Sequence, residues 1–137
     1  MKLFRPTEET KFHIDQSWFE KSGLDFRIAV FKCLSAEQQE RIGEPSAAQT
    51  YDYVNPATGE IERIDTVLRT VRQEGPGDPN FITPRAPVAE SAFRVFLLNG
   101  NQPLSPTELS TRLNRKPSEI LAHLGGRVVY NGIRPIY

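Results

Sequence analysis

Apolar residues recur at helical spacing in the first third of the chain. From Leu24 to Phe31 they return every three or four positions, which is the period of one face of an α-helix. Gly23 lies directly before this run and separates it from the start of the helix. The spacing therefore predicts a bent or broken helix over residues 17–34.

Polar residues before these apolar runs predict where the helices begin. Asp15 or Ser17 can cap the first helix, and Ser17 with Glu20 three residues later forms a capping-box pattern. Ser35 with Gln38 repeats this pattern and predicts a second, short helix. The first part of the chain is therefore expected to contain at least two capped helices.

The middle of the chain changes from helical to alternating periodicity. Residues 51–64 read YDYVNPATGEIERI, in which aromatic and β-branched residues lie on both sides of a turn-forming NPATG. This pattern predicts a β-hairpin with Glu60 and Glu62 on its solvated side. Asp65 can then cap a helix that ends at Gly75.

Prolines and glycines divide the chain in two. The stretch GPGDPNFITPRAP contains four prolines and two glycines, so neither a helix nor a sheet can run through it. We expect an N-terminal helix-plus-hairpin subdomain over residues 1–75, a connector over 76–87 and a C-terminal unit over 88–137. The predicted fold class is α+β.

Three helices are predicted after the connector. The first presents apolar residues on one face between Ala89 and Leu97. The second begins at the SPTE sequence of residues 105–108, which places Ser at the cap, Pro at the first helical position and Glu at the third. Pro117 opens the third helix after a short turn, and two glycines end it.

The sequence ELSTRLNRKPSEILAHL at residues 108–124 resembles the helix-turn-helix of bacterial regulators. Residues 127–130 and 133–137 follow as two short β-forming runs on either side of Asn131-Gly132, which is a strong hairpin signal. Together these features resemble the winged helix-turn-helix superfamily over about 50 residues, roughly 88–137.

This resemblance implies a third helix in the DNA major groove and a wing that touches the backbone. Carried over to this sequence, the solvent face of the recognition helix comprises Ser118, Glu119, Ala122 and His123, and the candidate phosphate contacts are Arg115, Lys116, Arg127 and Arg134. That helix face has no Arg, Asn or Gln for bidentate base reading. Glu119 can accept from a cytosine or cap its own helix.

Charge is distributed unequally along a chain of zero net charge. Residues 1–80 hold 10 basic and 14 acidic side chains, whereas residues 81–137 hold 7 basic and 3 acidic ones. The resemblance to winged helices, together with this asymmetry, implies a non-enzymatic nucleic-acid-binding or transcription-associated regulatory protein whose basic half contacts DNA. The acidic half is expected to contact a protein partner or a second copy. The alternative is a protein–protein interaction adaptor that uses the winged helix as a docking module.

Other classes of function have little support in the sequence. His13, Asp15 and Ser17 are the residue types of a catalytic triad, but three close neighbours on one short stretch rarely converge. No metal site is expected, because no second His or Cys lies at ligand spacing, and no cofactor is expected. We predict a cytoplasmic protein without a membrane span, whose single Cys33 packs on a helix face.

Overall fold

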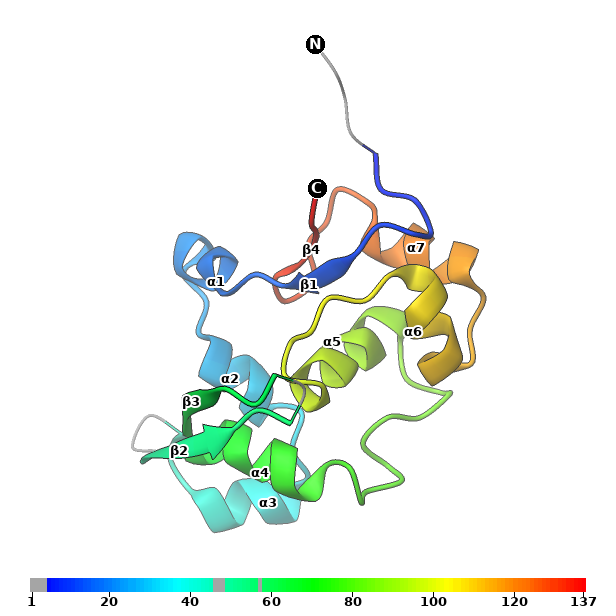
Figure 1. Ribbon diagram of the computed structural model, residues 1–137. Helices are drawn as coiled ribbons and strands as arrows, with labels where there is room; N and C mark the ends of the chain where they lie inside the picture. The colour runs from blue at the N-terminus through cyan, green and yellow to red at the C-terminus, as the bar shows by residue number, and fades with distance from the viewer. Residues whose placement is uncertain (1–4, 46–48, 57) are drawn as a thin grey trace.

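The computed structural model describes residues 5–45, 49–56 and 58–137. Within these residues the chain forms seven helices and two separate two-stranded antiparallel sheets, so the predicted α+β class is confirmed. Helix α5 (Val88–Leu98) is buried in the middle of the molecule. It contacts α4 on one side, α6 and α7 on another, and strand β1, as Figure 1 shows.

The predicted break in the first helix is present. Helix α1 (Gln16–Ser22) ends at Gly23, whose φ of 70° is the left-handed value that glycine adopts readily, and α2 (Phe26–Phe31) follows. The cap of α1 is Asp15, which accepts a hydrogen bond from the amide of Ser17 at 3.0 Å. The predicted capping box that starts at Ser17 is therefore wrong, because Ser17 already lies inside the helix.

The middle of the chain follows the predicted order of elements. Helix α3 (Ala36–Ile42) has the expected capping box at its start. Strands β2 (Thr50–Val54) and β3 (Ile61–Asp65) then pair as an antiparallel hairpin. Asp65 caps α4 (Thr66–Glu74) by accepting from a first-turn amide at 2.9 Å.

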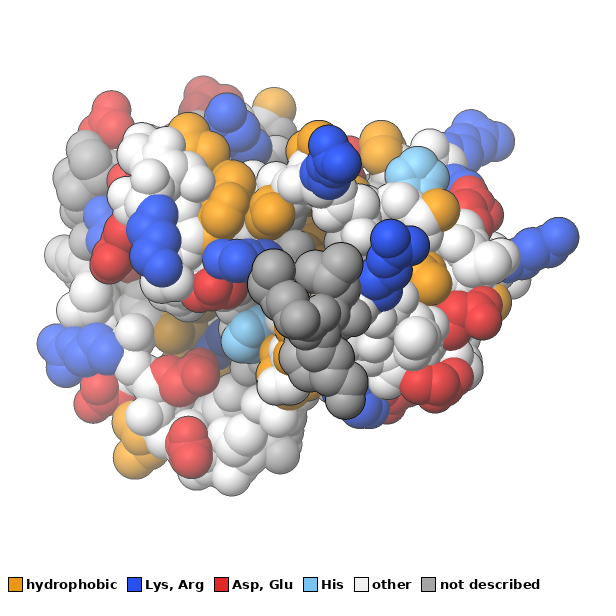
Figure 2. Space-filling view, turned by 90° about the horizontal axis from the view of Figure 1, so that it is seen from above, with side chains coloured by type: hydrophobic (Ala, Val, Ile, Leu, Met, Phe, Trp, Pro, Cys, Tyr) orange, Lys and Arg blue, Asp and Glu red, His pale blue; other side chains and the backbone are white. Residues whose placement is uncertain are grey.

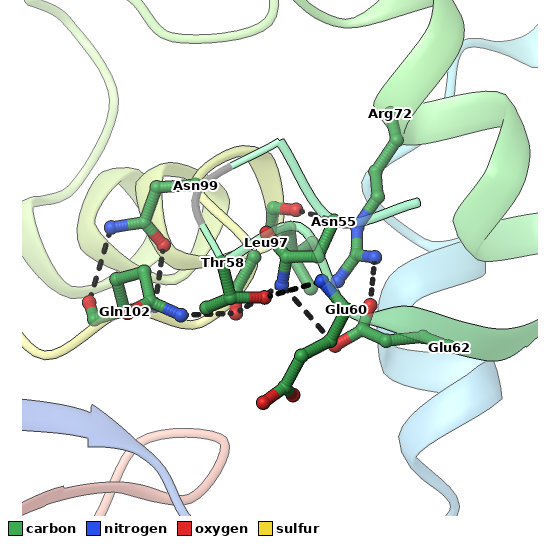
Figure 3. A network of polar contacts seen from close by, with 9 residues as sticks. Asn55, Thr58, Glu60, Glu62, Arg72, Leu97, Asn99 and Gln102 are labelled. Atoms are coloured by element: carbon green, nitrogen blue, oxygen red, sulfur yellow. Dashed lines mark hydrogen bonds and ion pairs between the residues drawn. The ribbon is translucent and has the colours of Figure 1, made fainter. Parts of the chain in front are cut away.

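A buried polar network attaches this hairpin to the rest of the molecule (Figure 3). The Arg72 guanidinium, 6% exposed, forms an ion pair with Glu62 at 2.5 Å and donates to the Leu97 carbonyl at 3.4 Å. The amide of Asn55 donates to the Gly100 carbonyl at 3.4 Å. Glu62 was expected on the solvated side of the hairpin. It instead forms an ion pair with Arg72, in the network that joins the hairpin to the end of α5.

The three helices after the connector are present as predicted. Helices α6 (Pro106–Leu113) and α7 (Pro117–Leu124) follow α5, and both begin with proline. Ser105 caps α6 with the predicted capping box. Asn114 ends this helix in the left-handed conformation, at φ 54° and ψ 45°.

The predicted wing hairpin is wrong. Asn131-Gly132 does form a tight turn with positive φ at both residues, closed by a hydrogen bond from the Ile133 amide to the Tyr130 carbonyl at 3.0 Å. Residues 127–130, however, form no strand. Strand β4 (Ile133–Pro135) pairs instead with β1 (Phe12–Ile14), more than a hundred residues earlier.

Burial explains why β4 pairs with β1. Phe12 and Ile14 are 0% and 3% exposed, so β1 contributes two apolar side chains to the core. Val128, on the expected first strand of the wing, is 82% exposed and has no core to pack against. The backbone of Phe12 also exchanges two hydrogen bonds with Leu104, at 2.8 and 3.0 Å, on the opposite edge of β1.

One hydrophobic cluster contains residues from both sides of the connector. Phe12 and Phe19 belong to it together with Phe93 and Phe96 of α5. The hydrophobic core therefore extends across residues 76–87. The division of the chain into two units at these residues stays a prediction. None of the helices in the described ranges is long and apolar enough to cross a membrane.

Candidate nucleic-acid interface

Helices α6 and α7 are oriented by their buried leucines and isoleucine. Leu109 and Leu113 of α6 are 0% and 5% exposed, and Ile120 and Leu124 of α7 are equally well buried. These side chains fix the inward faces of the two helices. The other face of α7 therefore points to solvent.

The side chains expected on a recognition face lie on the side of α7 that is turned to solvent. Ser118, Ala122 and His123 are exposed on α7, whereas Glu119 is only partly exposed. None of the three exposed residues carries the paired donor and acceptor that reads a base edge bidentately. The exposed face of α7 is therefore small and weakly polar.

Arg115 makes contacts within the protein. Its guanidinium pairs with the Glu119 carboxylate at 2.6 Å and donates to the Pro84 carbonyl at 2.9 Å. The first contact lies along α7 and neutralises the carboxylate that was considered for cytosine. The second attaches the turn between α6 and α7 to residues 76–87. Arg115 is thus less available for a phosphate than the sequence suggested.

The hydrogen bond between Arg115 and the Pro84 carbonyl brings Arg85 near the turn between α6 and α7. Arg85 follows Pro84 directly and is exposed, and Lys116 follows Arg115 and is also exposed. Arg112, in the last turn of α6, is exposed four residues before Lys116, so their Cα atoms lie within about 14 Å. We call Arg85, Arg112 and Lys116 the α7 basic cluster.

The α7 basic cluster is free of acidic partners. Within the part of the chain that the structure describes, none of its three side chains forms an ion pair or hydrogen bond. Sequence reasoning missed Arg85, which lies in the expected linker, and Arg112, which was read only as part of the helix pattern. The sequence feature that could have identified Arg112 is its position in the last turn of α6, directly before the segment that leads to α7.

The remaining two predicted phosphate contacts lie elsewhere. Arg127 is exposed beyond the C-terminal end of α7, opposite the end that carries Lys116. Arg134 lies on β4 with its guanidinium 3.5 Å from the Asp15 carboxylate. The eight predicted residues therefore do not form one cluster, because they divide between the two ends of α7 and the β1–β4 sheet.

Basic side chains are spread over the surface among acidic ones. Figure 2 shows Lys and Arg side chains separated by red and white areas on the face seen from above, which fits a net charge of zero. Among the described residues, the basic side chains on this face do not form one large continuous patch. An anion would therefore be held by local clusters of cations and not by the charge of the whole molecule.

The residue types of a catalytic triad do not form one. The Ser17 hydroxyl donates directly to the Asp15 carboxylate at 2.7 Å, which is the main reason that the pKa of Asp15 is lowered. No hydrogen bond joins His13 to either residue in the described ranges. Among those residues there is also no group of three His, Cys, Asp or Glu side chains placed to hold a metal ion.

Cys33 lies just after α2, partly buried, and its thiol donates to the Ala29 carbonyl at 3.5 Å. Cys33 was expected on the face of a helix, and it instead lies just after the end of that helix. Burial raises the pKa of this thiol to about 11. A thiol with so high a pKa is a poor nucleophile at neutral pH.

No protein-family model, curated protein or solved structure matches this chain.

Proposed function

We propose that this chain is a non-enzymatic nucleic-acid-binding protein, associated with transcription, that contacts the backbone of duplex DNA through the helix-turn-helix. The observation that carries the proposal is the α7 basic cluster. Arg85, Arg112 and Lys116 are exposed, and none of them has an acidic partner among the described residues. The nearby Glu119 is neutralised by Arg115. Unpaired cations at such spacing are the usual source of affinity for phosphate.

The start of α7 supports the same proposal. Lys116 is the cap residue of this helix, and no side chain there accepts a hydrogen bond from the first-turn amides. Free amides and the positive end of the helix dipole both favour a phosphate oxygen at this position. The cations and the helix end therefore favour the same ligand.

In this proposal the protein binds DNA without reading its sequence. The exposed face of α7 presents Ser118, Ala122 and His123, which lack the bidentate groups that distinguish bases by about 1–3 kcal/mol per contact. Contacts to phosphate position a protein on DNA but carry no direct sequence information. Unrelated duplexes should therefore bind with affinities that agree within about fivefold.

Other parts of the proposal concern partners and location. The acidic first half of the chain would contact a protein partner or a second copy. The protein would work in the cytoplasm, where a reducing environment keeps Cys33 as a free thiol. The adaptor alternative, with the helix-turn-helix as a docking module, stays a prediction.

The test is a fluorescence anisotropy titration of labelled mixed-sequence duplex DNA with the full chain at low salt. The variant replaces the three residues of the α7 basic cluster: Arg85→Ala, Arg112→Ala and Lys116→Ala. We expect saturable binding by the wild type and a loss of at least about tenfold in the variant, because three phosphate contacts are removed. Equal binding by both proteins would overturn the assignment of the site.

A control variant removes the same charge elsewhere. Lys21→Ala, Lys32→Ala and Arg63→Ala remove three exposed cations from the first half of the chain. In about 0.1 M salt, where the screening length is about 10 Å, this control should bind DNA within about threefold of the wild type, since charges far from the site are then largely screened. A loss equal to that of the cluster variant would mean that net charge and not the site controls binding.

A further inference from the structure

A groove lies at the opposite end of α7 from the α7 basic cluster. It has a volume of about 490 Å³, and its lining comes from the end of α7, from β4 and the residues after it, and from the N-terminal segment. Leu121, Leu124 and Pro135 contribute its apolar surface, together with Pro6. Ligand pockets commonly have volumes of about 300–1,000 Å³ and mostly apolar walls. The groove has the size and chemistry of a binding site.

The N-terminal wall of this groove is held in place by specific contacts. The Thr107 amide at the start of α6 donates to the Glu8 carbonyl at 3.1 Å, and the Thr107 hydroxyl donates to the Glu9 carboxylate at 2.7 Å. A Cβ atom on Gly125 would lie 3.1 Å from the Pro6 ring, so the chain segments approach closely there. The groove is thus a built feature between packed segments.

The charged side chains that line the groove are both basic. Arg5 and Arg127 line it together with Tyr137, and among the described residues no Asp or Glu side chain does, whereas the comparable hollows elsewhere contain Asp25 and Glu90 or Glu62 and Asp65. Neither arginine forms an ion pair within the described ranges. Two free guanidiniums beside an apolar floor are complementary to a ligand that carries both carboxylates and apolar groups.

We propose that this groove is a docking site for a short peptide segment of a partner protein that combines acidic residues with large apolar side chains. Apolar side chains of the peptide pack on Leu121 and Pro135, and its carboxylates pair with Arg5 and Arg127. This assigns Arg127 to a protein partner and removes it from the candidate phosphate contacts. The site is separate from the α7 basic cluster, so the inference does not require the proposed DNA binding.

A peptide fits the groove better than a nucleic acid does. A phosphate backbone would satisfy the two arginines but leave the leucine and proline surface uncovered. Aliphatic side chains also offer no stacking partner to a base, which is what single-stranded nucleic acids use on protein surfaces. Burial of that apolar surface, at about 25 cal/mol per Å², favours a ligand with side chains of its own to bury.

The experiment uses the full chain, isotopically labelled, and follows its backbone amide and leucine methyl NMR signals. The probe is a capped peptide of sequence Glu-Leu-Asp-Phe-Glu-Leu. Two matched peptides serve as controls, Lys-Leu-Lys-Phe-Lys-Leu with reversed charge and Glu-Ala-Asp-Ala-Glu-Ala without large apolar groups. We expect saturable shifts at Leu121, Leu124 and Arg127 with the first peptide, and at least tenfold weaker binding of either control.

A charge-reversal variant tests the two arginines. Arg5→Glu with Arg127→Glu should weaken binding of the acidic peptide by at least tenfold and leave DNA binding within about threefold. Arg112→Glu with Lys116→Glu is the matched variant, which should do the opposite. Both pairs are exposed, and circular dichroism checks that the variants fold.

Three results would overturn the docking proposal. The first is no groove shift at millimolar peptide, and the second is equal binding of the reversed-charge peptide. The third is competition of short DNA with the peptide for the groove signals, which would make the arginines a phosphate site. None of these results depends on whether DNA binds at the α7 basic cluster, so the two proposals fail separately.

Discussion

Phe12→Ala tests whether the N-terminal strand is part of the structural core of the C-terminal helices. The Phe12 side chain is completely buried, and its backbone is bonded to Leu104 on one edge while β1 pairs with β4 on the other. The substitution removes the ring but leaves these backbone hydrogen bonds possible. What is lost is therefore the packing of the ring in the core.

The magnitude follows from this environment. Replacing a buried Phe by Ala typically costs about 3–5 kcal/mol, with the larger values where neighbours cannot collapse into the space. Hydrogen bonds on both edges of β1 hold its backbone in place, so the cavity cannot close easily. We expect a loss of about 4 kcal/mol in the free energy of unfolding, a large share of the roughly 5–15 kcal/mol of a domain of this kind.

The assay is urea denaturation followed by two probes. Trp18 fluorescence reports on α1, and far-ultraviolet circular dichroism reports on all the helices. Both transitions should shift together to lower urea. His13→Ala, on the same strand but partly exposed, is the control and should cost no more than about 0.5 kcal/mol. A loss below 1 kcal/mol for Phe12→Ala, or a shift of the Trp18 transition alone, would refute the reasoning.

Three further predictions concern single positions. Gly100→Ala should lower the free energy of unfolding by about 2–4 kcal/mol, because φ at Gly100 is 72° and the new Cβ would lie 2.4 Å from the side-chain amide nitrogen of Asn55. The control is Gly59→Ala, at φ 75° with no atom within 4 Å of the new Cβ, which should lower the free energy of unfolding by less. Equal losses for the two variants in denaturation would count against the close contact at Gly100. The Lys11 ammonium lowers the pKa of Glu108. The ionised Glu108 carboxylate therefore stabilises the folded protein above the usual carboxyl pKa, and this stabilisation is lost as the pH falls through the lowered pKa. Urea midpoints from pH 6 to 3 should consequently fall less in Glu108→Gln than in the wild type, and parallel curves would contradict this. Because burial raises the pKa of Cys33 to about 11, the folded protein should react with a thiol reagent at pH 8 more than about 100-fold slower than the unfolded protein, and similar rates would show that the thiol is not buried.

The helices of this protein were predictable because their signals are local. Ser105 and Glu108 form the cap of α6 within four residues, and Asn114 ends that helix with its own backbone conformation. Such patterns depend on near neighbours, so the sequence shows them directly. The same applies to the β2–β3 hairpin, whose strands are joined by one short loop.

The pairing of β4 was not predictable because its partner is distant. The residues around His13 alternate loosely and suggest a strand, but nothing in that pattern specifies a partner near Arg134. The hairpin signal at Asn131-Gly132 correctly predicted a turn and wrongly predicted the strand before it. Burial of the β1 side chains decided the pairing, and burial is a property of the whole fold.

The candidate site shows the same limit. Arg115 was expected to contact phosphate, but a carbonyl 31 residues away in the sequence accepts one of its hydrogen bonds. That contact brings the residue before Arg85 to the Arg115 side chain, which no local pattern indicates. The exposure of Ser118 and His123 was predictable, since it follows from the helical period of α7.

The measurement that tests the central claim most directly is the salt dependence of duplex DNA binding. Three phosphate contacts by the α7 basic cluster predict a slope of about −2.7 in log affinity against log salt, or an affinity about 40-fold lower at 200 mM than at 50 mM salt. The variant that lacks Arg85, Arg112 and Lys116 should bind weakly with a slope near zero. Absence of binding by the wild type at 50 mM salt, or binding that salt does not weaken, would contradict a DNA-backbone function for this protein.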